Sequence, residues 1–246
     1  SEEESIRARD YTLHLCEELG IVINLEKSDL TPYRTATYLG MELDSAILKA
    51  FPTRKRIDAL HSLISTFRSQ ESPPALLWQR LLGHLSSLCL LVPGGRRRMR
   101  SLQLSLNSRW DRTRWSQDYQ VTPSPDALQD LEWWEMESSL LQGKQLSPAV
   151  TPDLLVHTDA STEGWGVTLL DLHASGLWSQ AERKESINLL ELRALRLGLR
   201  QFSDVLQGKV VGLLSDNTTA ASYVRKEGGT RSASLNAEAQ LTLQWA

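Results

Sequence analysis

Residues 154–170 read LLVHTDASTEGWGVTLL, and they carry the strongest fold signal in the chain. A continuous apolar strand opens the stretch and ends at Asp159. A turn over 161–163 leads into a second strand over 164–170, and a third strand is expected over 174–179. We therefore expect three consecutive strands to build one sheet.

After this stretch the apolar residues first follow a helical period and then form another apolar strand. A strongly periodic helix is expected from Asn188 to about Leu206, and an apolar strand over 209–214 leads to Asp216. Two helices, over 218–226 and 232–245, follow. The order of three strands, a helix, a strand and two helices predicts an α/β unit with helices at its C-terminal end.

Upstream of Pro148 the chain divides into two further regions. The first has a helix over 6–19, a short strand Ile21–Asn24, a strand over 37–43 and another near 47–49. The second is helical, with helices over 54–67, 73–92 and 124–142 separated by Pro-rich or Gly-rich joints. We therefore predict three units, over residues 1–51, 52–147 and 148–246.

Composition sets limits on the function. With 41% hydrophobic and 23% charged residues, the chain has the composition of a soluble globular protein, and its net charge of −3 gives no overall argument for a polyanionic partner. Cys16 and Cys89 lie far apart and are expected to be buried free thiols. The sequence has no run of eighteen apolar residues and no secretory signal, so we expect an intracellular location and no membrane partner. Both ends look like cuts within a longer chain.

Three acids stand out by their positions. Asp159 and Asp216 each follow an apolar strand, and Glu191 is expected in the first turn of the long helix. Carboxylates held close together repel one another, and a divalent cation such as Mg²⁺ keeps them ionised. Two such ions about 3.5–4 Å apart can activate water and stabilise the leaving oxygen of a phosphodiester. The alternative is that the two aspartates cap strand ends and that Glu191 favours the helix N-terminus.

These segments together resemble a known family. Residues 157–161 (HTDAS), 164–166 (GWG), 187–192 (INLLEL), 215–219 (SDNTT) and 226–230 (KEGGT) resemble, in order, the ribonuclease H region of retroelement reverse transcriptases. The likeness is nearest to tyrosine-recombinase (DIRS-type) retrotransposons. It implies a ribonuclease H-like mixed sheet and hydrolysis of RNA in RNA–DNA hybrids. Asp159, Glu191 and Asp216 would be the ligands of Mg²⁺, with Mn²⁺ as a substitute.

The resemblance extends upstream. Residues 19–28 (LGIVINLEKS) and 38–45 (YLGMELDS) resemble the end of a reverse-transcriptase palm, with the 52–147 region as thumb and connection. It implies that Lys27 assists the triphosphate and that Tyr38, Leu39 and Gly40 steady the primer end of a primer–template. The aromatic-x-Asp-Asp turn of a polymerase is missing from the sequence, so polymerisation is expected only in a longer parent protein.

Ribonucleases H also take a fourth acid from a later helix. After Asp216 this sequence offers only Glu227 and Glu238, so three of the four expected ligands are present. The remainder of the polyprotein or polymerase is therefore an expected partner.

Local features suggest nucleic-acid contacts. Arg96, Arg97 and Arg98 open a basic stretch that could neutralise phosphates, and Trp110 and Trp115 could stack on a base or sugar. The alternative is a solvated basic face with tryptophans packed inward. The adjacent Trp133 and Trp134 must point to different sides of their helix.

Three positions beside the acids remain open between two roles. His157, two residues before Asp159, either touches the metal site or is a packed strand histidine. Asn217 and Thr218 either contact substrate or belong to a helix N-cap.

Two other functions compete with the nuclease. One is a catalytically inactive nucleic-acid-binding or scaffold remnant of a retroelement polymerase, which the missing polymerase aspartates and the missing fourth acid favour. The other keeps the sheet but changes the chemistry, as in integrases and some ATPases. The absence of a Gly-rich phosphate loop beside Asp159 argues against an ATPase.

Overall fold

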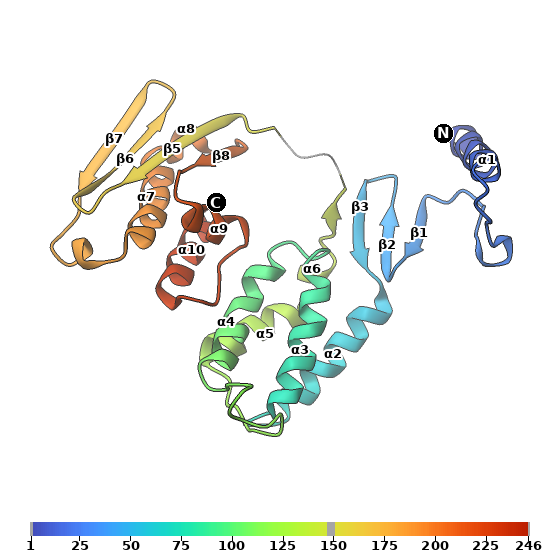
Figure 1. Ribbon diagram of the computed structural model, residues 1–246, viewed down its shortest axis with the longest axis horizontal. Helices are drawn as coiled ribbons and strands as arrows, with labels where there is room; N and C mark the ends of the chain where they lie inside the picture. The colour runs from blue at the N-terminus through green and yellow to red at the C-terminus, as the bar shows by residue number, and fades with distance from the viewer. Residues whose placement is uncertain (1, 147–150, 246) are drawn as a thin grey trace.

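The computed structural model describes residues 2–146 and 151–245 and contains two separate sheets with helices between and after them (Figure 1). The first part of the chain contains α1 (Glu2–Glu18), β1 (Thr35–Tyr38), β2 (Met41–Asp44), β3 (Lys49–Pro52) and the helices α2 (Arg54–Arg68), α3 (Ala75–Leu88), α4 (Gly95–Asn107), α5 (Pro125–Glu135) and α6 (Glu137–Leu140), followed by β4 (Lys144–Gln145). The second part contains β5 (Leu154–Ala160), β6 (Gly164–Leu169), β7 (Leu172–Leu177), α7 (Ile187–Gln201), α8 (Ser203–Leu206), β8 (Val211–Leu214), α9 (Thr218–Arg225) and α10 (Ala233–Trp245). The predicted boundary at 147/148 lies outside the described residues, and the division into units stays a prediction.

The first sheet is antiparallel, in the order β1-β2-β3-β4. The single strand predicted over 37–43 is wrong, because a two-residue turn splits it into β1 and β2. Both turn residues have positive φ, 47° at Leu39 and 75° at Gly40, which is the geometry of the type I′ turn that matches the twist of a hairpin. An Arg56 guanidinium nitrogen donates a hydrogen bond to the Gly40 carbonyl and holds this turn against α2.

Two further expectations about the first sheet fail. No strand forms at Ile21–Asn24, where the chain leads into a short 3₁₀ turn (Leu25–Lys27) and Val22 is 95% exposed. An apolar run becomes a strand only when it finds a partner, and this one pairs with neither sheet. Conversely, the strand β4 forms in a region that was predicted to be helical. After α6 the chain returns to the first sheet, and β4 pairs with β3 there.

Helices α2 to α6 enclose one hydrophobic core. Its largest fully buried side chains include Trp78 and Trp134, and the Trp78 indole donates a hydrogen bond to the Val121 carbonyl. Trp133 is partly buried against the same core, with the Arg98 guanidinium above its ring. The two adjacent rings nevertheless meet edge to face, with centroids 5.3 Å apart, and both contact the same core, so the predicted divergence of the two tryptophans is wrong. Helix α4, in the basic stretch, was not predicted as a separate helix.

Cys89, at the C-terminal end of α3, is a free thiol packed against this core. Burial raises the pKa of its thiol to about 11, which lowers the thiolate fraction at pH 8 roughly a hundredfold relative to an ordinary cysteine. In a Cys16→Ser background we expect iodoacetamide to alkylate Cys89 about a hundredfold more slowly in the native protein than in guanidinium. Equal rates in the two states, followed by mass spectrometry, would contradict the burial of this thiol.

The second sheet is mixed, in the order β7-β6-β5-β8, with β5 and β8 parallel and the other pairs antiparallel. Helix α7 packs on one face, against the buried side chains of Val156, Val167 and Leu169. Helices α9 and α10 pack mainly against α7, and Leu213 of β8 also contacts the cluster that these helices form. The mixed sheet with C-terminal helices, preceded by a helical region, confirms the predicted α/β class.

Helix α4 also contacts the second part of the chain. The Arg97 amide donates to the Glu227 carboxylate over 3.1 Å, and the Arg97 guanidinium donates to the Leu243 carbonyl of α10 over 2.8 Å. The Arg100 guanidinium donates to the carbonyls of Lys226 and Glu227 just after α9. Two arginines of one helix thus satisfy terminal carbonyls of two others, where positive charge is favoured. In the described residues, no helix is long and apolar enough to cross a bilayer.

Candidate metal centre

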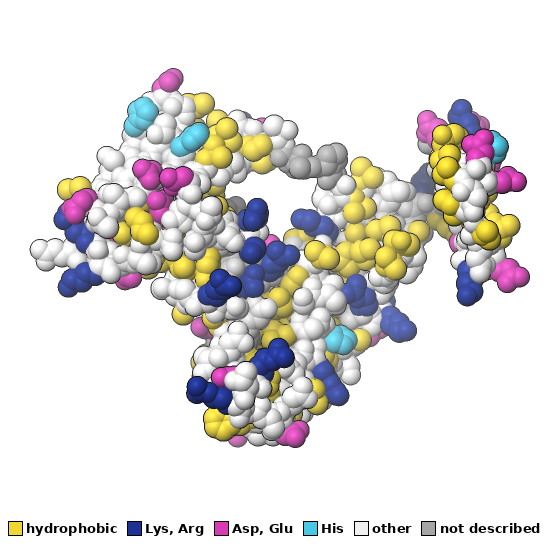
Figure 2. Space-filling view, in the orientation of Figure 1, with side chains coloured by type: hydrophobic (Ala, Val, Ile, Leu, Met, Phe, Trp, Pro, Cys, Tyr) yellow, Lys and Arg dark blue, Asp and Glu magenta, His cyan; other side chains and the backbone are white. Residues whose placement is uncertain are grey.

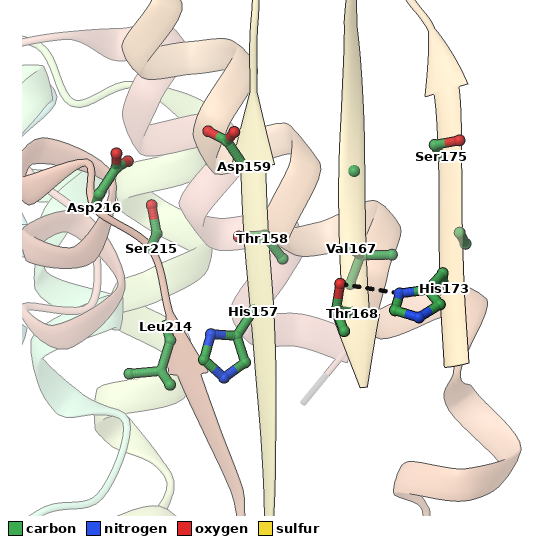
Figure 3. A pocket seen from close by; sticks show the side chains of 12 residues that line it. His157, Thr158, Asp159, Val167, Thr168, His173, Ser175, Leu214, Ser215 and Asp216 are labelled. Carbon is green, nitrogen blue, oxygen red and sulfur yellow. Dashed lines mark hydrogen bonds between the residues drawn. The ribbon is translucent and has the colours of Figure 1, made fainter. Parts of the chain in front are cut away.

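Asp159, Glu191 and Asp216 meet at one edge of the second sheet. Each offers a carboxylate oxygen, and these oxygens lie within 4.8 Å of one another. Asp159 lies in β5 opposite Gly166, and Asp216 follows β8, the parallel neighbour of β5 (Figure 3). Glu191 comes from the second turn of α7, not the first as predicted, because the helix begins at Ile187.

Close packing of α7 on the sheet brings Glu191 to this edge. Gly198 lies two helical turns after Glu191 on the same face of α7. A Cβ at position 198 would lie only 2.6 Å from Val167 Cγ2 and 3.4 Å from Thr158 Cγ2. The glycine therefore lets the helix backbone approach β5 and β6 closely enough for Glu191 to join the two aspartates.

The electrostatics of the cluster fit a cation. Glu191 is 4% exposed, and burial raises the pKa of its carboxyl, with further increases from the charges of Asp159 and Asp216. The Ala160 amide and the Ser215 hydroxyl act in the opposite direction. Among the described residues, Glu191 Oε2 has no hydrogen-bond partner. A buried, unpartnered oxygen beside two more carboxylates is the donor set that Mg²⁺ or Mn²⁺ binds.

The alternative of strand-end aspartates and a helix N-terminal glutamate fits these positions only in part. Asp159 lies inside β5, and the first turn of α7 carries no acid. Asp216 does follow the end of β8, but the N-cap of α9 is Asn217, whose side-chain oxygen accepts from the Ala220 amide. The alternative therefore does not explain why Asp159 and Glu191 lie beside Asp216.

The structure gives Asn217 the helix-capping role that the sequence left open. Its amide nitrogen also donates to the Asn188 side chain over 2.9 Å, which ties the start of α9 to the start of α7. Thr218, the next residue, is exposed. A direct contact of Asn217 or Thr218 with substrate stays a prediction.

The two later acids lie in other surroundings. Glu227 has φ of 54° and accepts the Arg97 amide, as described above. Glu238 in α10 is 5% exposed and forms ion pairs with Arg193 and Arg196 of α7. Neither belongs to the acidic cluster found among the described residues. Glu238 therefore binds two arginines of α7 and does not join the three carboxylates.

We expect Glu238→Gln to lower the free energy of unfolding by about 3 kcal/mol, because the partly buried Arg196 loses its counter-charge and Arg193 keeps only its ion pair with Glu182. The same variant should keep the full rise in melting temperature on adding Mn²⁺. Thermal denaturation with and without Mn²⁺ measures both, with the exposed Glu185→Gln as control. Loss of the Mn²⁺ response in a stable Glu238→Gln protein would instead make Glu238 a ligand.

The residues predicted from the palm resemblance lie away from the acids in the fold. Lys27 is exposed in the 3₁₀ turn, and Tyr38, 60% exposed, leads into the Leu39–Gly40 turn. They belong to the first sheet and its approach, whereas the three acids belong to the second sheet and α7. Their roles in holding primer or triphosphate stay predictions.

The basic stretch around α4 is only partly available to a polyanion. Lys and Arg side chains gather near the upper end of α4 in Figure 2. Arg97 is occupied by α10, and Arg98 pairs with Asp130 over 3.0 Å. Arg96 is partly exposed. Trp110 packs against the helical core, while Trp115 is 48% exposed beside Tyr119.

A groove of about 830 Å³ runs from the acids across the open face of the second sheet. His157 lines it and is exposed rather than packed in a core (Figure 3). Further along it lie Thr168, His173 and Ser175, which the sequence analysis did not single out. The alternation of side chains along each strand could have placed these residues on one face of the sheet. Their position beside Asp159 depends on how the strands pair, which the sequence does not give.

Comparison with known proteins adds a set of solved structures. The foamy viral protease-reverse transcriptase dRH in complex with double-stranded DNA is 18% identical, with a TM-score of 0.46, over all of this chain and 41% of that one. The foamy viral enzyme with an RNA/DNA hybrid is 16% identical, with a TM-score of 0.46, over 98% of this chain and 32% of that one. A third foamy viral complex, with double-stranded DNA, is 18% identical, with a TM-score of 0.41, over 88% and 44%.

This chain thus spans between about a third and under half of the length of those proteins. Neither a family model nor a curated protein sequence matches it.

Proposed function

We propose that this chain is part of a retroelement reverse transcriptase whose C-terminal unit hydrolyses RNA in RNA–DNA hybrids with two divalent cations, Mg²⁺ or Mn²⁺. The observation that carries the proposal is the convergence of Asp159, Glu191 and Asp216 from three separate elements to within 4.8 Å. The ordered motifs that resemble the ribonuclease H region support the same assignment.

The three carboxylates would hold the cations, which, when bound, activate a water and stabilise the departing oxygen of the phosphodiester. Asp159 and Asp216 are exposed at the groove, so they can share oxygens with a solvent-facing ligand. Glu191 is buried behind them and would hold its oxygens fixed. Since α7 and the strands position these groups before substrate arrives, little reorganisation is needed on binding.

The substrate class follows from the location of the cluster. Asp159 and Asp216 line an open groove rather than a closed cavity, which suits a polymer that continues on both sides of the reacting bond. Recognition of a hybrid through its shape, phosphates and 2′-hydroxyls requires no base-specific contact.

The test is cleavage of an end-labelled RNA–DNA hybrid by the purified chain with Mg²⁺, Mn²⁺ or EDTA. We expect short RNA products with either metal and none with EDTA, while RNA and DNA duplexes stay intact. Hybrid binding that needs neither metal nor Asp159, without cleavage, would favour the rival function, a catalytically inactive nucleic-acid-binding remnant. Failure to bind either metal or hybrid would reject both.

A further inference from the structure

The start of α4 and the loop after α9 satisfy each other's helix ends. The N-cap of α4 is Gly94, which has no side chain to cap the helix, and the first turn of α4 carries no acid. The Glu227 carboxylate supplies both a cap and a negative charge, because it accepts the Arg97 amide over 3.1 Å. The Arg100 guanidinium donates in turn to the carbonyl of Lys226, the C-cap of α9, over 2.7 Å. We call Arg97, Arg100 and Glu227 the clasp.

The loop that carries Glu227 has a fixed, close-packed shape. Gly228 is buried with a φ of 96°, and a Cβ there would lie 2.3 Å from Asn236 Oδ1 and 3.2 Å from Arg100 Cγ. Glu227 itself has a φ of 54°, which is unfavourable for a residue with a Cβ. Such a backbone persists only where its surroundings hold it, and here the contacts with α4 and α10 do so.

Helix α9 has little packing of its own. Of its eight described residues only Ala220 is buried, and Tyr223 and Val224 are partly buried against the neighbouring helices. A helix of this length is marginal without contacts that hold it. Asn217 caps its start and bonds to Asn188 of α7, and the clasp binds its other end. The position of α9 therefore depends on contacts at both ends.

Asp216 lies between β8 and α9. It follows β8, which ends at Leu214 and pairs with β5, and it directly precedes the N-cap of α9. We propose that the clasp positions Asp216 for metal binding, by holding α9 at the end opposite to that carboxylate. The inference rests on the proposed function and deepens it. It assigns a positioning role in the proposed metal centre to Arg100 and Glu227, which do not touch the cations.

The first test removes a side chain that cannot itself bind a cation. We expect Arg100→Ala to raise the dissociation constant of Mn²⁺ roughly tenfold, as changes in residues that orient metal ligands do. Isothermal titration calorimetry measures this constant, at a temperature where circular dichroism shows the variant to be folded. Arg80→Ala, the same change at an exposed position of α3, should leave the constant unchanged.

This measurement separates positioning from a merely structural role. A structural contact changes the melting temperature but not the affinity of the folded protein for Mn²⁺. No nucleic acid is present, so a phosphate contact of Arg100 would not affect the result either. An unchanged dissociation constant in a folded but less stable Arg100→Ala protein would overturn the proposal.

The second test compares two replacements of Glu227. Glu227→Gln keeps an oxygen that can accept the Arg97 amide, whereas Glu227→Ala removes it. We expect the glutamine variant to bind Mn²⁺ within about twofold of the parent, because only the charge at the helix N-terminus is lost. The alanine variant should bind roughly tenfold more weakly, as Arg100→Ala does. Equal weakening in both variants would make Glu227 a ligand and overturn its positioning role.

The third test disturbs the loop instead of the side chains, and it applies even if Arg100→Ala does not fold. The Cβ of Gly228→Ala would press on Asn236 and Arg100, so this variant should also bind Mn²⁺ more weakly. Gly208→Ala is the control, since Gly208 also has a positive φ, 70°, but no described heavy atom within 4 Å of a built Cβ. Equal dissociation constants in these two variants would contradict the proposal.

The outcomes separate this inference from the proposed function. If the parent binds Mn²⁺ and cleaves the hybrid, and the clasp variants bind Mn²⁺ as the parent does, only the positioning role is overturned. If the parent binds Mn²⁺ without cleaving, weaker binding by the clasp variants still supports the positioning role. A parent that does not bind Mn²⁺ overturns the proposed function and this inference with it.

Discussion

Replacing Asp159 by asparagine should abolish both the Mn²⁺ response and hybrid cleavage. The parent has three carboxylates within 4.8 Å, and a cation at about a hundredfold excess over its dissociation constant stabilises the folded state by roughly 2.7 kcal/mol. For a chain of this size that is a rise in melting temperature of roughly 5–10 °C. The variant should show little or no rise, and cleavage should fall on the order of a thousandfold.

Without metal, the melting temperatures of the parent and of Asp159→Asn should have the opposite order. Asp159 repels Glu191, whose carboxyl pKa is raised by burial and then by this charge. Without metal, Asp159→Asn should therefore melt slightly above the parent. Asp171→Asn, in the exposed turn between β6 and β7, is the matched control and should behave as the parent in both conditions. Cleavage that survives in Asp159→Asn would reject the metal centre.

Gly198→Ala should destabilise the protein, although alanine is the better helix former. The added Cβ would lie 2.6 Å from Val167 Cγ2, and Val167 is only 3% exposed and cannot move aside. Overpacking of this kind costs about 1–3 kcal/mol, more than the roughly 1 kcal/mol gained in helix propensity. Because Glu191 lies two turns away on the same face of α7, the shift should also reduce the Mn²⁺ response.

Gly83→Ala gives the matched comparison. Gly83 lies within α3, is exposed and has no atom within 4 Å of a built Cβ. The same chemical change should therefore raise the free energy of unfolding by about 0.5–1 kcal/mol. Urea denaturation of the two variants should show changes of opposite sign, and a stabilising Gly198→Ala would contradict the close approach of α7 to the sheet.

The second sheet and its acids were predictable because each signal is local. An apolar run that ends in an acid indicates a strand, and a 3.6-residue apolar period indicates a helix, whichever elements lie beside them in the fold. Asp159, Glu191 and Asp216 were identified in this way, and the fold brings them together. The prediction for Glu191 was wrong only in its position along α7, because the residue at which the helix begins was not exactly predicted.

Features that depend on long-range pairing were not predictable. The apolar run Ile21–Asn24 has the composition of a strand but lacks a partner, while β4 is a strand of two polar residues made by its pairing with β3. The groove beside the acids likewise exists only through the register of β5, β6 and β7. The sequence showed Glu238 as a spare acid, and only the packing of α10 on α7 gives it two arginines.

The hydrogen bonds between α4 and the loop after α9 have a consequence for the order of folding. Arg97 and Glu227 are 130 residues apart in the chain. Closing a flexible loop of that length costs entropy worth about 4–5 kcal/mol, more than a few surface hydrogen bonds return. Once the helical core and the second sheet have each folded, only the short segment between β4 and β5 separates them, and the effective concentration of the two surfaces rises. We therefore expect this docking to be the last step of folding and the first contact to open under mild denaturant.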